Sequence, residues 1–271
     1  MHATTATSWT LEPQGSATLT SFAGATIRHS SALVGRGQEI AEVAGQVRHS
    51  GLVHVTGTAG VGKSALALRI AQKLAPAFRG GYRAIDAARA LDCEHLRALI
   101  AAAIRAQRPA HAAAEDHAGE FAGLLLLIDN CDRHAACIAG VARTLRRVRP
   151  DVHVLITGRM LDAPDGPSFA VPPLAFPPDA AMLDARTAME FPAVRMFVQE
   201  AARHVPTFAL SGENTRGAIA ICRRVGGIPL AIKLAAAWLP HVAIATLADL
   251  VGPELLHRLL RTDPPRRDRR H

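Results

Sequence analysis

Residues 57–64 have the residue types and the spacing of a phosphate-binding loop. They match the pattern G-x-x-x-x-G-K-[ST] with Gly57-Thr58-Ala59-Gly60-Val61-Gly62-Lys63-Ser64. A phosphate chain needs several backbone N–H donors at close range, and glycines let the main chain wrap around it without Cβ atoms in the way. We expect Lys63 to contact the β- and γ-phosphates and the Ser64 hydroxyl to bind Mg²⁺. The segment through Ala65 is therefore a candidate site for nucleotide phosphates with Mg²⁺. The spacing alone does not choose between adenine and guanine, but the sequence has no guanine-reading N-K-x-D pattern, which favours ATP or ADP.

An acidic residue at the end of an apolar run is a candidate second metal ligand. Residues 124–128 read Leu-Leu-Leu-Leu-Ile, which is typical of a strand buried on both faces of a parallel sheet, and Asp129 follows them. Beside a phosphate loop, Asp129 could hold Mg²⁺ directly or through water. The alternative is that it caps a helix starting near Arg133. The phosphate loop favours the metal role.

An arginine follows another predicted strand. Residues 152–157 read Val-His-Val-Leu-Ile-Thr, which predicts a strand, and Gly158 and Arg159 follow them. Ligands of open parallel sheets bind at the carboxyl ends of the strands, so Arg159 could sense the γ-phosphate there. The alternative is an ordinary surface arginine.

The elements that must position these residues alternate between strands and helices up to about residue 175. Such alternation predicts an α/β fold, the parallel sheet with flanking helices of a P-loop NTPase. Beyond that point only helical patterns occur, which predicts a small all-α domain. The expected domains are a disordered segment (1–30), a nucleotide-binding domain (31–178), a helical domain (179–261) and a basic disordered tail (262–271).

Composition excludes several classes of protein. No apolar run approaches the ~20 residues needed to cross a bilayer, and the polar N-terminus lacks the pattern of a secretory signal. The four cysteines have no C-x-x-C pair and no metal-binding spacing. They predict reduced, mostly buried thiols in a cytoplasmic protein.

The net charge of +8 is carried almost entirely by arginine. One arginine cluster lies on the predicted helix 134–148 and its end, and another lies in the C-terminal tail. A basic balance can indicate nucleic-acid contact, but no recognition-helix motif accompanies it. We therefore expect direct DNA binding by this chain to be unlikely, and contact with a membrane to be absent.

The order of motifs resembles the NB-ARC nucleotide-binding proteins, a branch of the STAND signal-transduction ATPases. The resemblance is to the bacterial members found in large transcriptional regulators, and it covers about residues 30 to 245. The phosphate loop is shared by many families, whereas its combination with a Gly-x-Pro stretch in the helical region is more specific. The matching segments are residues 34–36, 57–64, 124–131, 157–159, 192–197 and 226–232.

The resemblance implies roles for individual residues. Val34, Gly35 and Arg36 would lie along the adenine and ribose, and Pro229 of the helical domain would close over the adenine. A nucleotide held by two domains changes their relative angle when the γ-phosphate leaves, which is the physical basis of a switch. The resemblance also implies that Lys63, Ser64, Asp129 and Arg159 bind phosphate and metal in the roles given above.

The sequence departs from related ATPases in two ways. Asn130 follows Asp129 where many relatives carry a second acid, and an amide cannot accept a proton as a carboxylate does. We therefore expect slow hydrolysis, with Asp132 pointing elsewhere. The chain also ends before the winged-helix and sensor regions of the family, which predicts a fragment, a truncated member or one part of a split system. Its partners would be other protein domains or subunits, with nucleotide-dependent self-association.

Two other functions compete with the regulatory switch. A phosphoryl-transfer enzyme such as a small kinase would need an acceptor pocket and a basic lid, and residues 143–149 are not obviously placed to form one. An arginine-driven DNA-binding module would show a steep dependence on salt.

Overall fold

The computed structural model describes residues 18–20, 26–28, 33–106, 120–159, 166–178 and 183–252. The chain forms two compact units. The first contains the residues up to Thr58 and those from Lys63 to Val171, and the second contains Ala59–Gly62 and the residues from Pro172 onward.

The first unit is built on a parallel five-stranded sheet, as the sequence predicts. Its strands occur in the order β4-β5-β6-β3-β7, and each neighbouring pair is parallel. Parallel neighbours need crossover connections, and helices make most of them here. The strands are β3 (Leu52–Thr56), β4 (Tyr82–Asp86), β5 (Leu125–Asp129), β6 (His153–Thr157) and β7 (Ser168–Ala170).

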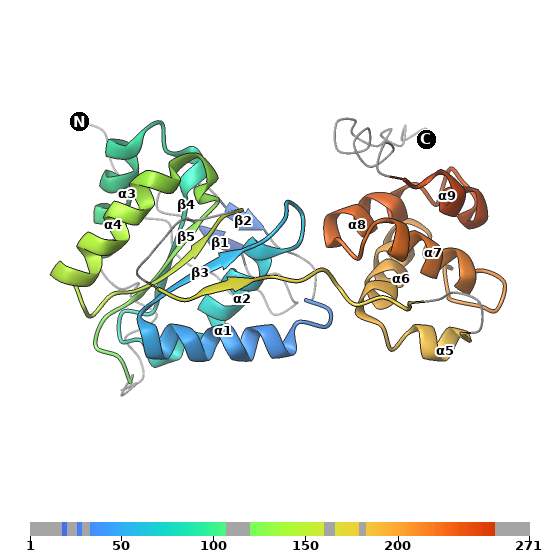
Figure 1. Cartoon of the computed structure of the whole chain (residues 1–271), viewed down its shortest axis with the longest axis horizontal. Coiled ribbons are helices and arrows are strands. Elements are labelled where there is room, and N and C mark those ends of the chain that lie inside the picture. The colour runs from blue at the N-terminus through green and yellow to red at the C-terminus, as the bar shows by residue number, and fades with distance from the viewer. Residues whose placement is uncertain are drawn as a thin grey trace. The chain divides into compact units, whose positions relative to one another are not determined.

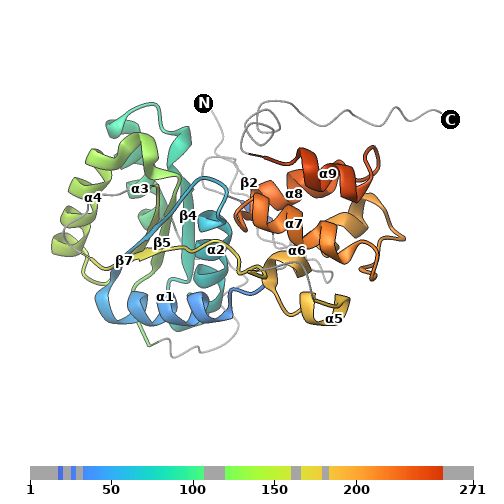
Figure 2. The same cartoon turned by 45° about the vertical axis from the view of Figure 1, so that its right-hand side comes forward.

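Two helices cover each face of this sheet (Figure 1, Figure 2). Helices α1 (Gly37–Ser50) and α2 (Lys63–Leu74) lie on one face, and α3 (Cys93–Arg105) and α4 (Ala135–Val148) lie on the other. The continuous apolar run of β5 is explained by this double cover, since all five of its residues are buried. Side chains alternate along a strand, so Leu126 and Ile128 pack with α3 and α4.

Short 3₁₀ turns follow the two strands that end in acids. Turn η2 (Ala87–Arg89) follows β4, and turn η4 (Cys131–His134) follows β5 and leads into α4. A third turn, η1 (Ala75–Ala77), follows α2 and contains Pro76, which cannot continue the helix. The turns η2 and η4 hold the chain close to the carboxyl edge of the sheet, where the candidate site lies.

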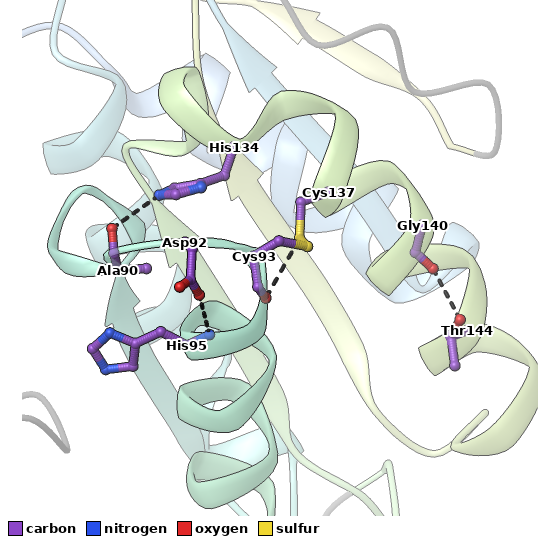
Figure 3. Close-up of a disulfide and its surroundings, with 8 residues drawn as sticks. All are labelled: Ala90, Asp92, Cys93, His95, His134, Cys137, Gly140 and Thr144. Atoms are coloured by element: carbon purple, nitrogen blue, oxygen red, sulfur yellow. Dashed lines mark hydrogen bonds between the residues drawn. A yellow bond between two sulfur atoms is a disulfide. The ribbon is translucent and has the colours of Figure 1, made fainter.

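A disulfide joins the first turns of α3 and α4 (Figure 3). It links Cys93 to Cys137, whose Cα atoms lie 5.8 Å apart although 44 residues separate them in the sequence. The expectation of four reduced thiols is therefore wrong for this pair. Cys131 and Cys222 are free and buried as expected, and burial raises the pKa of the Cys222 thiol to about 12.

The second unit is helical, as predicted. Phe197 and Ile232 are among its fully buried residues. Prolines at the first position of α6 and of α8 start these helices, because a proline there loses no intrahelical hydrogen bond. The helices are α5 (Ala185–Ala188), α6 (Pro192–His204), α7 (Thr215–Arg224), α8 (Pro229–Ala237) and α9 (Ile244–Leu250).

The ends of the chain are described only in part. Strands β1 (Thr18–Thr20) and β2 (Thr26–Arg28) pair antiparallel within the segment that we expected to be disordered. The rest of that segment and the predicted basic tail lie outside the described residues. Within the part of the chain that the structure covers, each helix is too short or too polar to cross a bilayer.

Candidate nucleotide site

The phosphate loop joins β3 to α2 through three glycines with positive φ. These angles are 142° at Gly57, 77° at Gly60 and 101° at Gly62. A residue with a Cβ would be strained at all three positions, which explains why the motif needs glycine there. The last loop glycine precedes Lys63, the first residue of α2. The free N–H groups of the first turn of α2 and its positive dipole end therefore point toward the loop.

The Lys63 ammonium lies over its own loop. Its Nζ donates to the carbonyl oxygens of Gly57, at 2.8 Å, and of Thr58, at 2.9 Å. Burial lowers the pKa of Lys63, as does the charge of Arg159, whereas Asp132 and Asp129 raise it. The cation is therefore held at the loop within electrostatic range of both acids.

Asp129 is a buried carboxylate at the carboxyl end of β5. It is 2% exposed, and the Thr157 hydroxyl donates a hydrogen bond to it. Burial raises the pKa of Asp129, and hydrogen bonds from Thr157 and Ser64 act in the opposite direction. The two residues predicted to bind Mg²⁺, Ser64 and Asp129, thus lie within hydrogen-bonding reach of each other. A hydroxyl and a carboxylate are the hard oxygen donors that Mg²⁺ prefers, so the residues fit the ion.

Asn130 lies between two carboxylates. It has a left-handed backbone, with φ 58°, and its Nδ2 donates to Asp86 Oδ1 at 3.0 Å and to Asp129 Oδ2 at 3.3 Å. Its backbone N–H donates to the Thr157 hydroxyl at 3.0 Å. The β4–β5 register pairs Asp86 with Asp129, so both acids point to the same face of the sheet. Asp86 and Thr157 are not among the site residues predicted from the sequence. Their positions at the ends of strands were the available signal.

Asp132 belongs to the edge of the site, contrary to our expectation that it points elsewhere. Its Oδ1 accepts the backbone N–H of Arg159 at 2.5 Å, and its Oδ2 lies 3.9 Å from Arg159 Nε. The left-handed turn at Asn130 followed by η4 directs the chain back toward the end of β6. The Arg159 side chain is 70% exposed, and the Arg159 carbonyl accepts from Gly57 N–H at 3.4 Å. Arg159 is therefore next to the base of the phosphate loop.

The residues assigned to the adenine by resemblance are placed as follows. Gly35 has a φ of 68°. Arg36, which directly precedes α1 and is only 4% exposed, donates a hydrogen bond at 2.8 Å to Glu39 in the first turn of that helix. Pro229 is the first residue of α8 in the second unit. The adenine contacts of residues 34–36 and of Pro229 stay predictions.

Residues 32–165 match the model of the AAA ATPase domain. An uncharacterized protein of Mycobacterium tuberculosis is 32% identical over 217 residues, which cover 78% of this chain and 52% of that protein. A protein of the same organism described as a candidate HTH-type transcriptional regulator is 29% identical over 73% of this chain and 21% of its own length. The chain thus spans about half, or less, of the length of these curated relatives.

Two solved structures resemble the chain in fold. A Walker-type ATPase of Pyrococcus abyssi has a TM-score of 0.50 at 13% identity and covers 84% of this chain and 72% of its own. A chain of the Drosophila ORC bound to DNA has a TM-score of 0.53 at 11% identity, and the match covers 84% of this chain and 65% of the ORC chain. At these identities the likeness concerns the fold alone. The match to the family model, the parallel sheet and the geometry of the loop agree that residues 32–165 form an AAA-type P-loop ATPase domain.

Proposed function

We propose that this chain is an ATP- and ADP-binding regulatory switch of the NB-ARC or STAND type. One observation carries the proposal: the Lys63 ammonium lies at the phosphate loop beside an oxygen cluster of the buried Asp129 and Thr157 and the half-buried Ser64. These are the parts needed to hold a triphosphate and its metal ion. The similarity to a candidate transcriptional regulator supports a role in regulation.

Each residue of the site has a defined task in this proposal. Lys63 would exchange its two carbonyl partners for phosphate oxygens, which form stronger, charge-assisted hydrogen bonds. Ser64 and Asp129 would hold Mg²⁺, and the charge of the ion would offset the cost of the buried Asp129 carboxylate. When bound, Mg²⁺ neutralises charge on the phosphates.

Slow hydrolysis follows from the partners of Asn130 and Asp132. The Asn130 amide is bonded to Asp86 and Asp129 and has no basic atom with which to activate water. The Asp132 carboxylate accepts the backbone N–H of Arg159. The γ-phosphate would compete with Asp132 for the exposed Arg159 guanidinium, which gives the site a way to distinguish ATP from ADP. The nucleotide would then act as a switch.

Replacement of Lys63 tests the proposal. Lys63→Ala should weaken binding of a fluorescent ATP analogue about 100-fold, because two charge-assisted contacts together contribute about 3 kcal/mol. Lys73→Ala, on the exposed last turn of the same helix, is the matched control and should bind like the parent. Equal affinities of the Lys63→Ala variant and the parent, with both folded by circular dichroism, would refute the assignment.

Phosphate release by the parent protein, incubated with ATP and Mg²⁺, gives the hydrolysis rate. A turnover well below ~1 per second supports a switch, whereas a rate within the usual ~1–100 per second of phosphoryl-transfer enzymes contradicts it. Identification of the nucleotide that co-purifies with the protein adds a second readout, since retained ADP supports the switch.

A further inference from the structure

A groove runs between α3 and α4 on the outer side of the sheet. Its volume is about 490 Å³, within the range of protein ligand sites. It lies on the face of the sheet opposite α1 and α2 (Figure 1). Its lining residues are Arg97, Ile100, Ala101, Ile104, Arg105, Gly140, Val141, Thr144, Leu145 and Arg149.

The two helices that form the groove run in the same direction. The disulfide joins their first turns, and the lining then advances along both helices to Arg105 and Arg149. Ile100 and Ile104 on α3 are one turn apart, as are Val141 and Leu145 on α4. The floor is continuous with the core, because Ile100 and Val141 are buried in it and Ile104 and Leu145 pack against it. The groove is thus an apolar channel parallel to two helices.

Small side chains keep the channel open. A Cβ added at Gly140 would meet no atom within 4 Å. One turn further, Thr144 turns its hydroxyl back to the Gly140 carbonyl at 3.0 Å, so its polar atom is satisfied within α4 (Figure 3). Ala101 is the small lining residue on α3. The space between the helices therefore suits apolar side chains supplied by another segment.

The rim of the groove is positively charged. Arg97 and Arg105 of α3 line it and are exposed, and Arg149 lies at its far end in a bidentate pair with Asp151. None of the lining residues is acidic. The sequence of α4 contains no Asp or Glu but three further arginines, at 143, 146 and 147. A ligand that fits must therefore be apolar along its centre and negative at its sides.

We propose that the α3–α4 groove is the docking site for an acidic amphipathic helix of a partner protein. A helix laid between two others packs its ridge of side chains into the groove that they leave, with apolar anchors at i, i+3, i+4 and i+7. Glutamates flanking that stripe would face Arg97 and Arg105. Val148, which is 62% exposed at the end of α4, extends the apolar surface beyond the groove.

The apolar floor distinguishes this partner from a nucleic acid. A phosphate backbone would bind the arginines through charge alone and would gain nothing from Ile104 or Leu145. A helix with an apolar stripe uses both the charge and the floor. A test must therefore alter the rim and the floor separately.

The experiment uses the full chain and a fluorescein-labelled synthetic peptide as the probe. The peptide is a helix of about 18 residues with leucines on one stripe and glutamates on the flanks, and a scrambled peptide of the same composition is its control. Fluorescence anisotropy is measured at low and physiological salt, with a labelled DNA duplex in a parallel titration. The protein variants are Arg97→Glu/Arg105→Glu for the rim and Gly140→Leu for the floor.

We expect the amphipathic peptide to bind the parent protein, and the scrambled peptide to bind at least tenfold more weakly. The rim variant and Gly140→Leu should each lose at least tenfold in affinity. The control Arg69→Glu/Arg216→Glu has the same change in charge at two exposed arginines outside the groove and should bind like the parent. ATP binding should be unchanged in all variants, which verifies their folding.

Three results would overturn the proposal. The first is no binding of the amphipathic peptide by the parent protein. The second is equal binding of the scrambled peptide, which would mean attraction by charge alone. The third is a combination of two observations. The DNA duplex binds the parent and Gly140→Leu but not the rim variant, and the peptide binds Gly140→Leu as tightly as the parent. That pattern would assign the basic face to nucleic acid.

Discussion

The two faces of the central sheet differ in what they bury. Toward α1 and α2, the end of β5 carries the buried carboxylate of Asp129, bonded to the Thr157 hydroxyl at the end of β6. Toward α3 and α4, the same strands carry Ile128 and Ile156 in a continuous apolar core. Neighbouring residues of a strand point to opposite faces of the sheet. The polar site residues Asp129 and Thr157 therefore lie on one face, although each directly follows an isoleucine that is buried in the core on the other face.

The face toward α3 and α4 thus contributes stability, whereas the face toward α1 and α2 carries the residues of the proposed function. A buried carboxylate with a raised pKa costs stability, and its polar neighbours offset the cost only in part. The opposite face compensates with apolar contacts and a disulfide across its two helices. Proteins commonly lose stability at functional sites in this way. Three changes test whether the two faces are independent.

The largest effect should come from the disulfide on the α3–α4 face. Cys93→Ser/Cys137→Ser should lower the free energy of unfolding by up to about 4 kcal/mol, because the bond closes a loop of 44 residues in the unfolded chain. Urea unfolding followed by circular dichroism measures this. Dithiothreitol should destabilise the parent but not the variant. Unchanged ATP affinity would show that the faces are independent, and equal stability of variant and oxidised parent would contradict the prediction.

A smaller and opposite effect should come from the site itself. Asp129→Asn should raise the free energy of unfolding at pH 7 without Mg²⁺, by less than the loss of the disulfide lowers it, because the variant removes a charge whose burial is unfavourable. The sign follows because burial raises the folded pKa of Asp129. The charged form therefore disfavours folding at neutral pH, and stability rises as the pH falls through the folded pKa toward the ordinary value of 3.8. Mg²⁺-dependent ATP binding should weaken in the same variant.

The control for this prediction is Asp151→Asn, at a carboxyl whose pKa is lowered by the hydrogen bond from Arg149. That variant should not gain stability. If Asp129→Asn is less stable than the parent, the Asp129 carboxylate stabilises the folded protein. The idea that one face of the sheet provides stability while the other loses it at the site would then be wrong.

The smallest effect concerns His153, which packs against the stacked rings of Phe78 and Phe121 on the α1–α2 side. Burial lowers its pKa from the ordinary 6.5. Below about pH 6.5 the unfolded chain binds a proton that the folded chain does not, so stability falls with decreasing pH until the folded pKa is reached. The contribution is at most about 1.4 kcal/mol per pH unit.

His153→Leu should therefore flatten the dependence of stability on pH between 4 and 7, measured by urea unfolding. His49→Leu, at an exposed histidine of α1, is the matched control and should leave the slope unchanged. An unchanged slope in His153→Leu would show that the ring accepts a proton in the folded protein.

Local patterns predicted most of the fold. The predicted strands at residues 124–128 and 152–157 correspond to β5 (Leu125–Asp129) and β6 (His153–Thr157), with bounds that differ by at most one residue. Helix α4 begins one residue after the predicted start and ends at the predicted residue. These elements were predictable because hydrophobic periodicity and the glycine and proline breaks act within a few residues. The assignments of individual site residues and the extents of the domains stay predictions.

The sequence patterns did not predict which residues from distant segments of the chain contact each other. The motif G-x-x-x-x-G-K-[ST] determined where a phosphate loop would form, since the spacing of its glycines and lysine sets the local backbone. Only the tertiary structure decided that Asp86 lies beside Asp129, that Asp132 reaches Arg159 and that Cys93 meets Cys137. Strand order and register bring such residues together from segments tens of residues apart, and neither is encoded in the spacing of nearby residues.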